Sequence, residues 1–134
     1  MPIRIAIVED NTADVLLIRE ALNAHQISFD MLHMKDGADA IAQLCGKASD
    51  HPGPDVILLD LNMPKIGGLE VLAAIRNDPQ LRTVPVIVLT SSPAPEEQQA
   101  ARRLGVVHYL QKPVDLYEFI DQVGGAIRDL VRNN

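Results

Sequence analysis

The sequence has 134 residues, and its 18 acidic against 12 basic side chains give a formal net charge of −6 at pH 7. This length predicts a single compact domain over residues 1–134, and 47% apolar with 22% charged residues is typical of a globular rather than a disordered protein. Short apolar runs, a lone cysteine and the absence of a basic cluster argue against a membrane protein, a secreted disulfide-rich mini-protein and a free-standing DNA-binding domain.

Five short apolar runs alternate with segments of helical period along the chain. We expect the runs to be strands, at Ile3–Val8, Ile27–Met34, Asp55–Leu59, Val84–Leu89 and Val106–Leu110. Apolar residues three and four apart in the intervening segments indicate helices with one buried face. These stripes are Val15, Ile18, Leu22 and His25; Ala38, Ile41, Ala42 and Cys45; and Leu116, Phe119, Ile120, Val123 and Ile127. The alternation predicts an α/β fold, a three-layer α/β/α sandwich.

The polar content of each run predicts its place in the sheet. Val56–Leu59 and Val86–Leu89 do not alternate with polar residues, which is typical of parallel strands covered on both faces. The second run alternates at Ser28 and Asp30, so we expect it at an edge. Gly46–Pro54 is predicted to be an exposed loop before the third strand.

Cap residues predict where the helices begin and end. Asn11 or Thr12 is expected to cap the first helix. Ser91 or Ser92 is expected to cap the fourth helix, and Gly105 to end it.

Polar residues follow four of the predicted strands. Glu9 and Asp10 come after the first strand, Asp60 after the third, Thr90 after the fourth and Lys112 after the fifth. Ligands of open parallel sheets bind beyond the carboxyl ends of the strands. Oxygen-only ligands suit Mg²⁺ better than zinc, and a lysine and a hydroxyl beside it would form a pocket for a phosphoryl group, which a carboxylate can carry covalently. Each residue alone has an ordinary explanation, such as a helix cap or a turn, but their joint occurrence favours the pocket.

These residues lie within motifs that resemble the receiver domain of bacterial two-component response regulators. The matching pieces are VEDN at 8–11, DVILLDLNMP at 55–64, GG at 67–68, VIVLTS at 86–91 and YLQKP at 109–113. They run in the family's order and spacing along the whole chain. The resemblance implies a flavodoxin-like fold with a five-stranded parallel sheet of order 2-1-3-4-5 and no effector domain.

The resemblance also implies a phosphorylation site that agrees with the predicted pocket. Asp60 would accept the phosphoryl group from a kinase phosphohistidine. Asp10 and Asp60 would ligate Mg²⁺ together with the backbone carbonyl of Asn62, and Glu9 would reach the metal directly or through water. Lys112 would pair with the phosphoryl oxygens, and the protein would catalyse only its own phosphorylation and slow dephosphorylation, without being an enzyme acting on other substrates.

A switch is implied by the same resemblance. Thr90 would hydrogen-bond the phosphoryl group and Tyr109 would swing into the space that it leaves, with the Lys112–Pro113 bond cis. The segment Pro95–Leu104 offers few apolar anchors, which is typical either of a mobile output face or of an ordinary solvated helix.

Partners follow from the resemblance as well. The loop before the third strand and the sequence KPVDL at 112–116 look most like stand-alone receivers of phytochrome-type histidine kinases. A cytoplasmic location, an unidentified downstream protein, and neither nucleic acid nor membrane are expected. The pair Gly124 and Gly125 indicates either close packing or a homodimer contact.

Two alternatives were weighed against the phosphoacceptor. A phosphatase of the haloacid dehalogenase type also uses an aspartate nucleophile, Mg²⁺, a threonine and a lysine. It needs an acid two residues after the nucleophile, where this chain has Asn62, and a cap domain that we do not find. A pseudo-receiver that binds partners without phosphorylation is disfavoured by the complete pocket.

Overall fold

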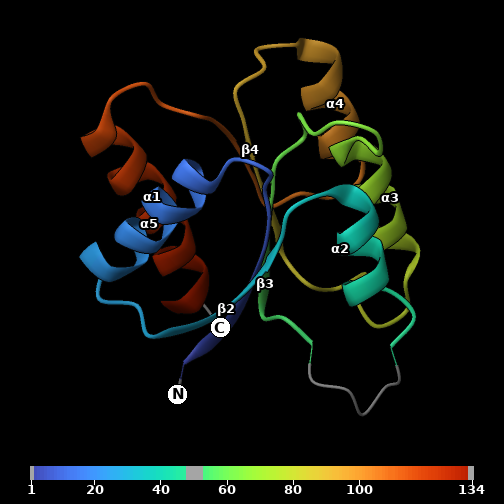
Figure 1. Cartoon of the computed structure of the whole chain (residues 1–134), viewed down its shortest axis with the longest axis horizontal. Coiled ribbons are helices and arrows are strands. Elements are labelled where there is room, and N and C mark those ends of the chain that lie inside the picture. Colours follow the sequence, from blue (N-terminus) through green and yellow to red (C-terminus); the bar gives the residue numbers. More distant parts are fainter. Residues whose placement is uncertain (1, 48–52, 133–134) are drawn as a thin grey trace.

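The computed structural model describes residues 2–47 and 53–132, in which five strands alternate with five helices (Figure 1). The strands are β1 Ile3–Val8, β2 Phe29–Met34, β3 Val56–Leu59, β4 Val86–Thr90 and β5 His108–Gln111. The helices are α1 Thr12–Ala24, α2 Gly37–Leu44, α3 Gly68–Asn77, α4 Pro95–Arg103 and α5 Leu116–Arg132. All five predicted strands are present, with ends shifted by up to two residues. Within the predicted Gly46–Pro54 loop, residues 48–52 lie outside the described residues.

The strands form one parallel sheet of order β2-β1-β3-β4-β5, which confirms the predicted fold and the edge position of the second strand. The register pairs Val8 of β1 with Met34 of β2 and with Leu59 of β3. The carboxyl ends of these three neighbouring strands therefore lie level with one another, at the top of the sheet in Figure 1.

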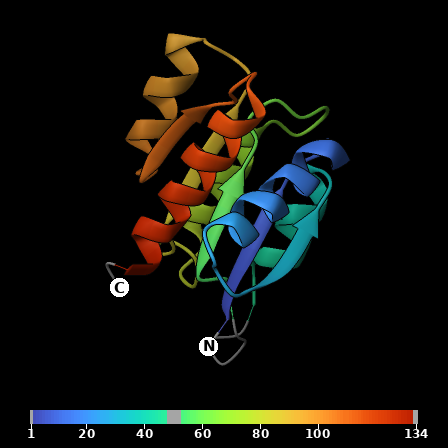
Figure 2. The ribbon, with the colours of Figure 1, turned by 90° about the vertical axis from the view of Figure 1, so that its left-hand side faces the viewer.

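Helices cover both faces of the sheet. In Figures 1 and 2, α1 and α5 lie side by side over one face, whereas α2, α3 and α4 lie over the other. Alternate residues of each strand serve the two faces, so Ile5 and Ile7 pack under α1 and α5 while Ala6 and Val8 pack under α2 and α3. Burial on both faces explains why the central strands carry no polar residue until they end. No helix among the described residues has both the length and the apolar character needed to cross a membrane.

The helix ends match the sequence prediction at α1 but not at the start of α4. Asn11 caps α1, and its side-chain oxygen accepts from the N–H groups of Ala13 and Asp14. The predicted serine cap of α4 is wrong, because the helix begins at Pro95 with Ala94 as the capping residue. Proline suits the first helical position, since it lacks the N–H that would stay unpaired there.

The C-terminus of α4 follows the prediction, and Ser92 has a different role from the predicted one. Its hydroxyl oxygen accepts from the Ala94 N–H at 3.2 Å and so shapes the turn before the helix. Gly105 follows α4 with φ +76°, the left-handed conformation that ends helices at glycine.

The apolar stripe of α2 is rotated from the predicted one. Its buried residues are Gly37, Ala40 and Leu44, whereas Ala38 and Ala42 are exposed. The buried residues follow the predicted spacing, shifted by one residue toward the N-terminus. This shift puts the large Leu44 in the core and leaves Ala38 and Ala42 exposed. Burial of larger apolar area decides the rotation of the helix.

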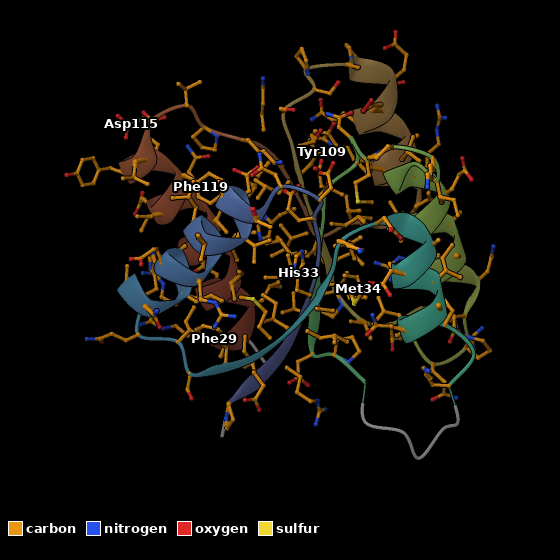
Figure 3. All side chains as sticks on the ribbon, in the orientation of Figure 1. Phe29, His33, Met34, Tyr109, Asp115 and Phe119 are labelled. Atoms are coloured by element: carbon orange, nitrogen blue, oxygen red, sulfur yellow. The ribbon has the colours of Figure 1, made fainter. Side chains whose placement is uncertain are left out.

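Phe119, Val123 and Ile127 of the predicted α5 stripe are buried, and Phe119 points toward α1 (Figure 3). The predicted inclusion of Leu116 is wrong, since this residue at the start of the helix is exposed. Gly124 permits a close approach of α5 to α1, because a Cβ there would meet the ring of His25 and lie 2.8 Å from the carbonyl oxygen of Ala21. Close packing therefore accounts for Gly124, which makes a homodimer contact unnecessary as an explanation at this position.

Candidate functional site

The sheet register brings two carboxylates together at its carboxyl edge. Glu9 and Asp60 each follow a residue of the Val8–Leu59 pair, and the Asp60 N–H donates to the carbonyl of Val8 at 3.0 Å. The neighbouring strand β2 adds a contact, since Nε2 of His33 lies 2.7 Å from the carbonyl oxygen of Glu9 and donates to it. Contacts from β1, β2 and β3 thus hold the backbones of Glu9 and Asp60 in place.

Glu9, Asp10 and Asp60 form an acidic cluster. One carboxylate oxygen from each lies within 4.8 Å of the others. Glu9 and Asp60 are buried, at 2% and 4% exposed, whereas Asp10 is exposed at the mouth. A set of oxygen donors with one side open to water fits a hard divalent cation that keeps part of its hydration shell.

The protonation of Glu9 reflects the crowding in this cluster. Burial and the hydrogen bond with Asp60 raise the pKa of Glu9 to about 8, and the contact with Lys112 opposes this only partly. The negative charge of Asp60 also raises the pKa of Glu9. A bound cation would offset the repulsion between these carboxylates, so the cluster is electrostatically suited to a cation.

Lys112 is the cation of the site. Its Nζ lies 2.7 Å from Asp14 Oδ2, 2.8 Å from Glu9 Oε1 and 3.3 Å from Asp60 Oδ2. Burial by itself would lower the pKa of Lys112, but the hydrogen bonds to Asp14 and Glu9 outweigh it and hold that pKa above its usual range. The Lys112 N–H continues the β4–β5 ladder by donating to the carbonyl of Thr90 at 2.7 Å.

The peptide bond that follows Lys112 differs from the expectation. No peptide bond among the described residues is cis, so the Lys112–Pro113 bond is trans and the expected cis bond is wrong. Trans is the favoured form of a bond to proline by about 0.5–1 kcal/mol.

Asp14 belongs to the site although the sequence analysis did not include it. It lies in the first turn of α1 and makes the shortest of the three contacts of Lys112. The available signal was its closeness in sequence to Glu9 and Asp10, since Asp14 lies in the first turn of the helix that follows them. Asp14 lies on a helix and not directly after a strand, so the strand-end pattern that predicts the other site residues does not include it.

Thr90 and Asn62 are hydrogen-bonded to each other beside Asp60. Thr90 is fully buried, and its Oγ1 accepts from Asn62 Nδ2 at 2.9 Å and from the Ser92 N–H at 3.1 Å. The Asn62 N–H donates to Asp60 Oδ1 at 2.9 Å and so orients that carboxylate. The hydroxyl of Thr90 is therefore linked to Asp60 through a single residue.

Gly68 allows α3 to begin directly against the loop that carries Asp60. A Cβ at this position would lie 2.3 Å from the Cα of Leu61 and 2.6 Å from the carbonyl oxygen of Asp60. The Gly68 N–H also donates to the carbonyl of Leu61 at 3.2 Å. Only glycine fits at this position, and the close contact holds the loop that carries Asp60 against the start of α3.

Tyr109 lies on β5 and its side chain points toward α4 (Figure 3). Its hydroxyl oxygen is buried, as is Oε2 of Glu97 on α4, and neither atom has a hydrogen-bond partner in the described structure. Burial and the negative charge of Glu97 raise the pKa of Tyr109. A buried hydroxyl without a hydrogen-bond partner lowers the stability of the fold by about 1–3 kcal/mol, so the present position of the Tyr109 side chain is unfavourable for its hydroxyl.

The structure thus brings Glu9, Asp10, Asp60, Asn62, Thr90 and Lys112 to one edge of the sheet, whereas Tyr109 lies within β5. A buried carboxylate, Asp60, lies within 4.8 Å of carboxylate oxygens of Glu9 and Asp10 and 3.3 Å from the ammonium of Lys112. Such a pocket can hold a cation and an anionic group together and present the carboxylate to an electrophilic phosphorus.

The chain is similar to proteins of one family along most of its length. It matches the response regulator receiver domain over residues 5–124. Response regulator Rcp1 of Synechocystis sp. is 40% identical over 123 residues, which cover 90% of this chain and 84% of the relative. Polar-differentiation response regulator DivK of Brucella anthropi is 30% identical over 129 residues, which cover 96% and 99% of the two chains.

Two solved structures extend the similarity to three dimensions. The phosphorylated cyanobacterial phytochrome response regulator RcpA has a TM-score of 0.89 at 36% identity, over 100% of this chain and 97% of that one. The Mn²⁺-bound form of response regulator Rcp1 has a TM-score of 0.81 at 40% identity, over 92% and 91% of the two chains.

Proposed function

Since the chain belongs to the response regulator receiver domain family, we propose that it accepts a phosphoryl group on Asp60 from the phosphohistidine of a sensor histidine kinase. The observation that carries the proposal is that Asp60 is buried, shares the acidic cluster with Glu9 and Asp10, and lies at hydrogen-bonding distance from the ammonium of Lys112. The relative RcpA is itself a phosphorylated protein. This chain would be a phosphoacceptor and not an enzyme acting on other substrates.

The transfer step is a displacement at phosphorus. A carboxylate oxygen of Asp60 attacks the phosphorus, the P–N bond to the kinase histidine breaks, and the histidine nitrogen keeps the electron pair of that bond. The site has little covalent chemistry to perform, so its residues act by position and by charge. Asn62 orients the Asp60 carboxylate through its N–H, and Lys112 meets the phosphoryl oxygens with its positive charge.

Glu9, Asp10 and Asp60 are the side chains that would hold Mg²⁺, with the backbone carbonyl of Asn62 as the expected fourth ligand. The all-oxygen donor set and the raised pKa of Glu9 support this assignment. The Mn²⁺-bound form of Rcp1 shows that a relative binds a divalent cation. When bound, the ion neutralises negative charge on the carboxylates and the phosphoryl group.

The proposed output is a movement of Thr90 and Tyr109 that alters the surface around α4 and α5. Thr90 would turn its hydroxyl toward the phosphoryl group, and Tyr109 would move into the space that it leaves. Two observations support a mobile element here: Ala101 is the only fully buried residue of α4 in the described structure, and the Tyr109 hydroxyl is unpaired.

A phytochrome-type histidine kinase is the proposed donor, because relatives in the comparison are phytochrome response regulators. The exchange is proposed to take place in the cytoplasm, in agreement with the lone, unpaired Cys45. We propose that the chain acts as a single receiver domain through contact with an unidentified downstream protein. A homodimer stays a prediction, which sedimentation would test.

Phosphorylation is testable with a small donor. We would incubate the protein with acetyl phosphate and Mg²⁺ and measure its intact mass, with Asp60→Asn as the acceptor variant. Asp55→Asn is the matched control, since Asp55 lies five residues earlier, is exposed and pairs with Arg4 outside the pocket. One phosphoryl group is expected on the wild type and on Asp55→Asn, and none on Asp60→Asn. Equal labelling of all three proteins would refute the assignment of Asp60.

A further inference from the structure

The ammonium of Lys112 lies among three carboxyl groups. An ammonium carries three N–H groups, and three carboxyl groups surround Lys112, at 2.7 Å for Asp14, 2.8 Å for Glu9 and 3.3 Å for Asp60. The contact to the acceptor Asp60 is the longest of the three. Nζ donates to both Asp14 and Asp60, so the shorter bond to Asp14 holds the ammonium next to the reaction site.

The two anchoring carboxyl groups are not equivalent. Glu9 belongs to the acidic cluster with Asp10 and Asp60, whose oxygen atoms would turn to a cation. Asp14 lies outside that cluster, in the first turn of α1, and its N–H is itself held by the Asn11 cap. Asp14 is thus the one partner of Lys112 that keeps its full charge for the ammonium when a metal occupies the cluster.

The Asp14–Lys112 ion pair restricts the position of the ammonium. Both side chains are largely shielded, with 18% of Asp14 and 14% of Lys112 exposed. Shielding limits screening by solvent, so the pair restricts the position of Nζ more than a surface ion pair would. The residues are 98 positions apart, so the pair also ties α1 to the loop after β5.

We propose that Asp14 is a positioning residue that holds the ammonium of Lys112 over Asp60 for phosphoryl transfer. This inference rests on the proposed function. Without Asp14, the ammonium would have only Glu9 and Asp60 as partners. The ammonium would then compete with the cation for the oxygens of these two carboxylates and could move away from Asp60.

Two substitutions separate position from charge. Asp14→Asn and Asp14→Ala remove the same charge, but asparagine keeps a side-chain oxygen that accepts from Lys112. Glu20→Gln is the matched control, because Glu20 is exposed on the same helix and loses the same charge away from the pocket. Circular dichroism and amide NMR spectra would verify that each variant is folded.

Phosphorylation by acetyl phosphate at saturating Mg²⁺ is the first measurement, followed by intact mass over time at several donor concentrations. We expect the maximal rate to fall at least about tenfold in Asp14→Ala and clearly less in Asp14→Asn, since misplacement of a catalytic group costs rate steeply. The donor concentration at half-maximal rate should change little, and Glu20→Gln should match the wild type.

Mg²⁺ binding without a phosphoryl donor, followed by NMR titration, is the second measurement. Here we expect a dissociation constant several times higher in Asp14→Ala than in Asp14→Asn. Equal behaviour of these two variants in both measurements, or of Asp14→Ala and Glu20→Gln, would overturn the positioning role. A wild-type protein that gains no phosphoryl group would instead refute the proposed function, and with it any role of Asp14 in transfer.

Discussion

Replacing Gly68 with alanine should displace the loop that carries Asp60 without altering any polar group of the site. The added Cβ would lie 2.3 Å from the Cα of Leu61 and 2.6 Å from the carbonyl oxygen of Asp60. Both are backbone atoms, so no side-chain rotation relieves the overlap, and α3 or the loop must move. Overpacking of this kind costs about 1–3 kcal/mol, and alanine returns up to about 1 kcal/mol through its helix preference. We expect a net loss of about 1–2 kcal/mol in the free energy of unfolding.

The neighbouring glycine is the control for this prediction. Gly67 has an ordinary φ of −71°, and a Cβ there would meet no atom within 4 Å. Gly67→Ala should therefore change the free energy of unfolding by less than about 0.5 kcal/mol. Urea unfolding followed by circular dichroism measures both variants, since the chain has no tryptophan for fluorescence. Gly68→Ala should also accept phosphate more slowly because Asp60 is displaced, and equal stabilities of the two variants would refute the packing argument.

Three further outcomes are expected. Gly124→Ala should lose about 1–3 kcal/mol in urea unfolding because its Cβ would lie 2.8 Å from the carbonyl oxygen of Ala21. Gly125→Ala should lose nothing, since its Cβ would lie 3.9 Å from Arg128, an ordinary van der Waals distance, and similar losses in the two variants would contradict the α1–α5 contact. The pKa of Glu9 is about 8 in the folded state against an ordinary 4.5, so the metal-free protein should lose stability as pH rises from about 4.5 to about 8. Glu9→Gln should remove that slope in thermal unfolding and gain on the order of 2 kcal/mol at pH 8, and an unchanged slope would exclude Glu9 as its source. Arg76 donates to five backbone carbonyls at 2.7 to 3.5 Å, so Arg76→Leu should cost at least about 2 kcal/mol; a smaller loss would show that water replaces the guanidinium.

The sequence by itself determined the layers, the edge strand and most of the site. Strands buried on both faces must be apolar until they end, so the first polar residues after them, such as Asp60, mark the carboxyl edge of the sheet. In a parallel sheet these ends meet at one side, and the pocket follows from this rule without knowledge of any distance. The strand order came from the family motifs rather than from periodicity, and the structure confirms it.

Only the tertiary structure decided contacts between distant elements and the rotation of weakly patterned helices. On α2, two alternative stripes have the same spacing, and the volume available for Leu44 selects one of them. Lys112 and Asp14 are 98 residues apart, and no local pattern records that α1 turns a carboxylate toward the loop after β5. Gly68 and Gly124 likewise need glycine because another backbone lies against them. Periodicity reports which face of an element is buried, whereas these contacts depend on what lies opposite that face, which is set only when the layers pack together.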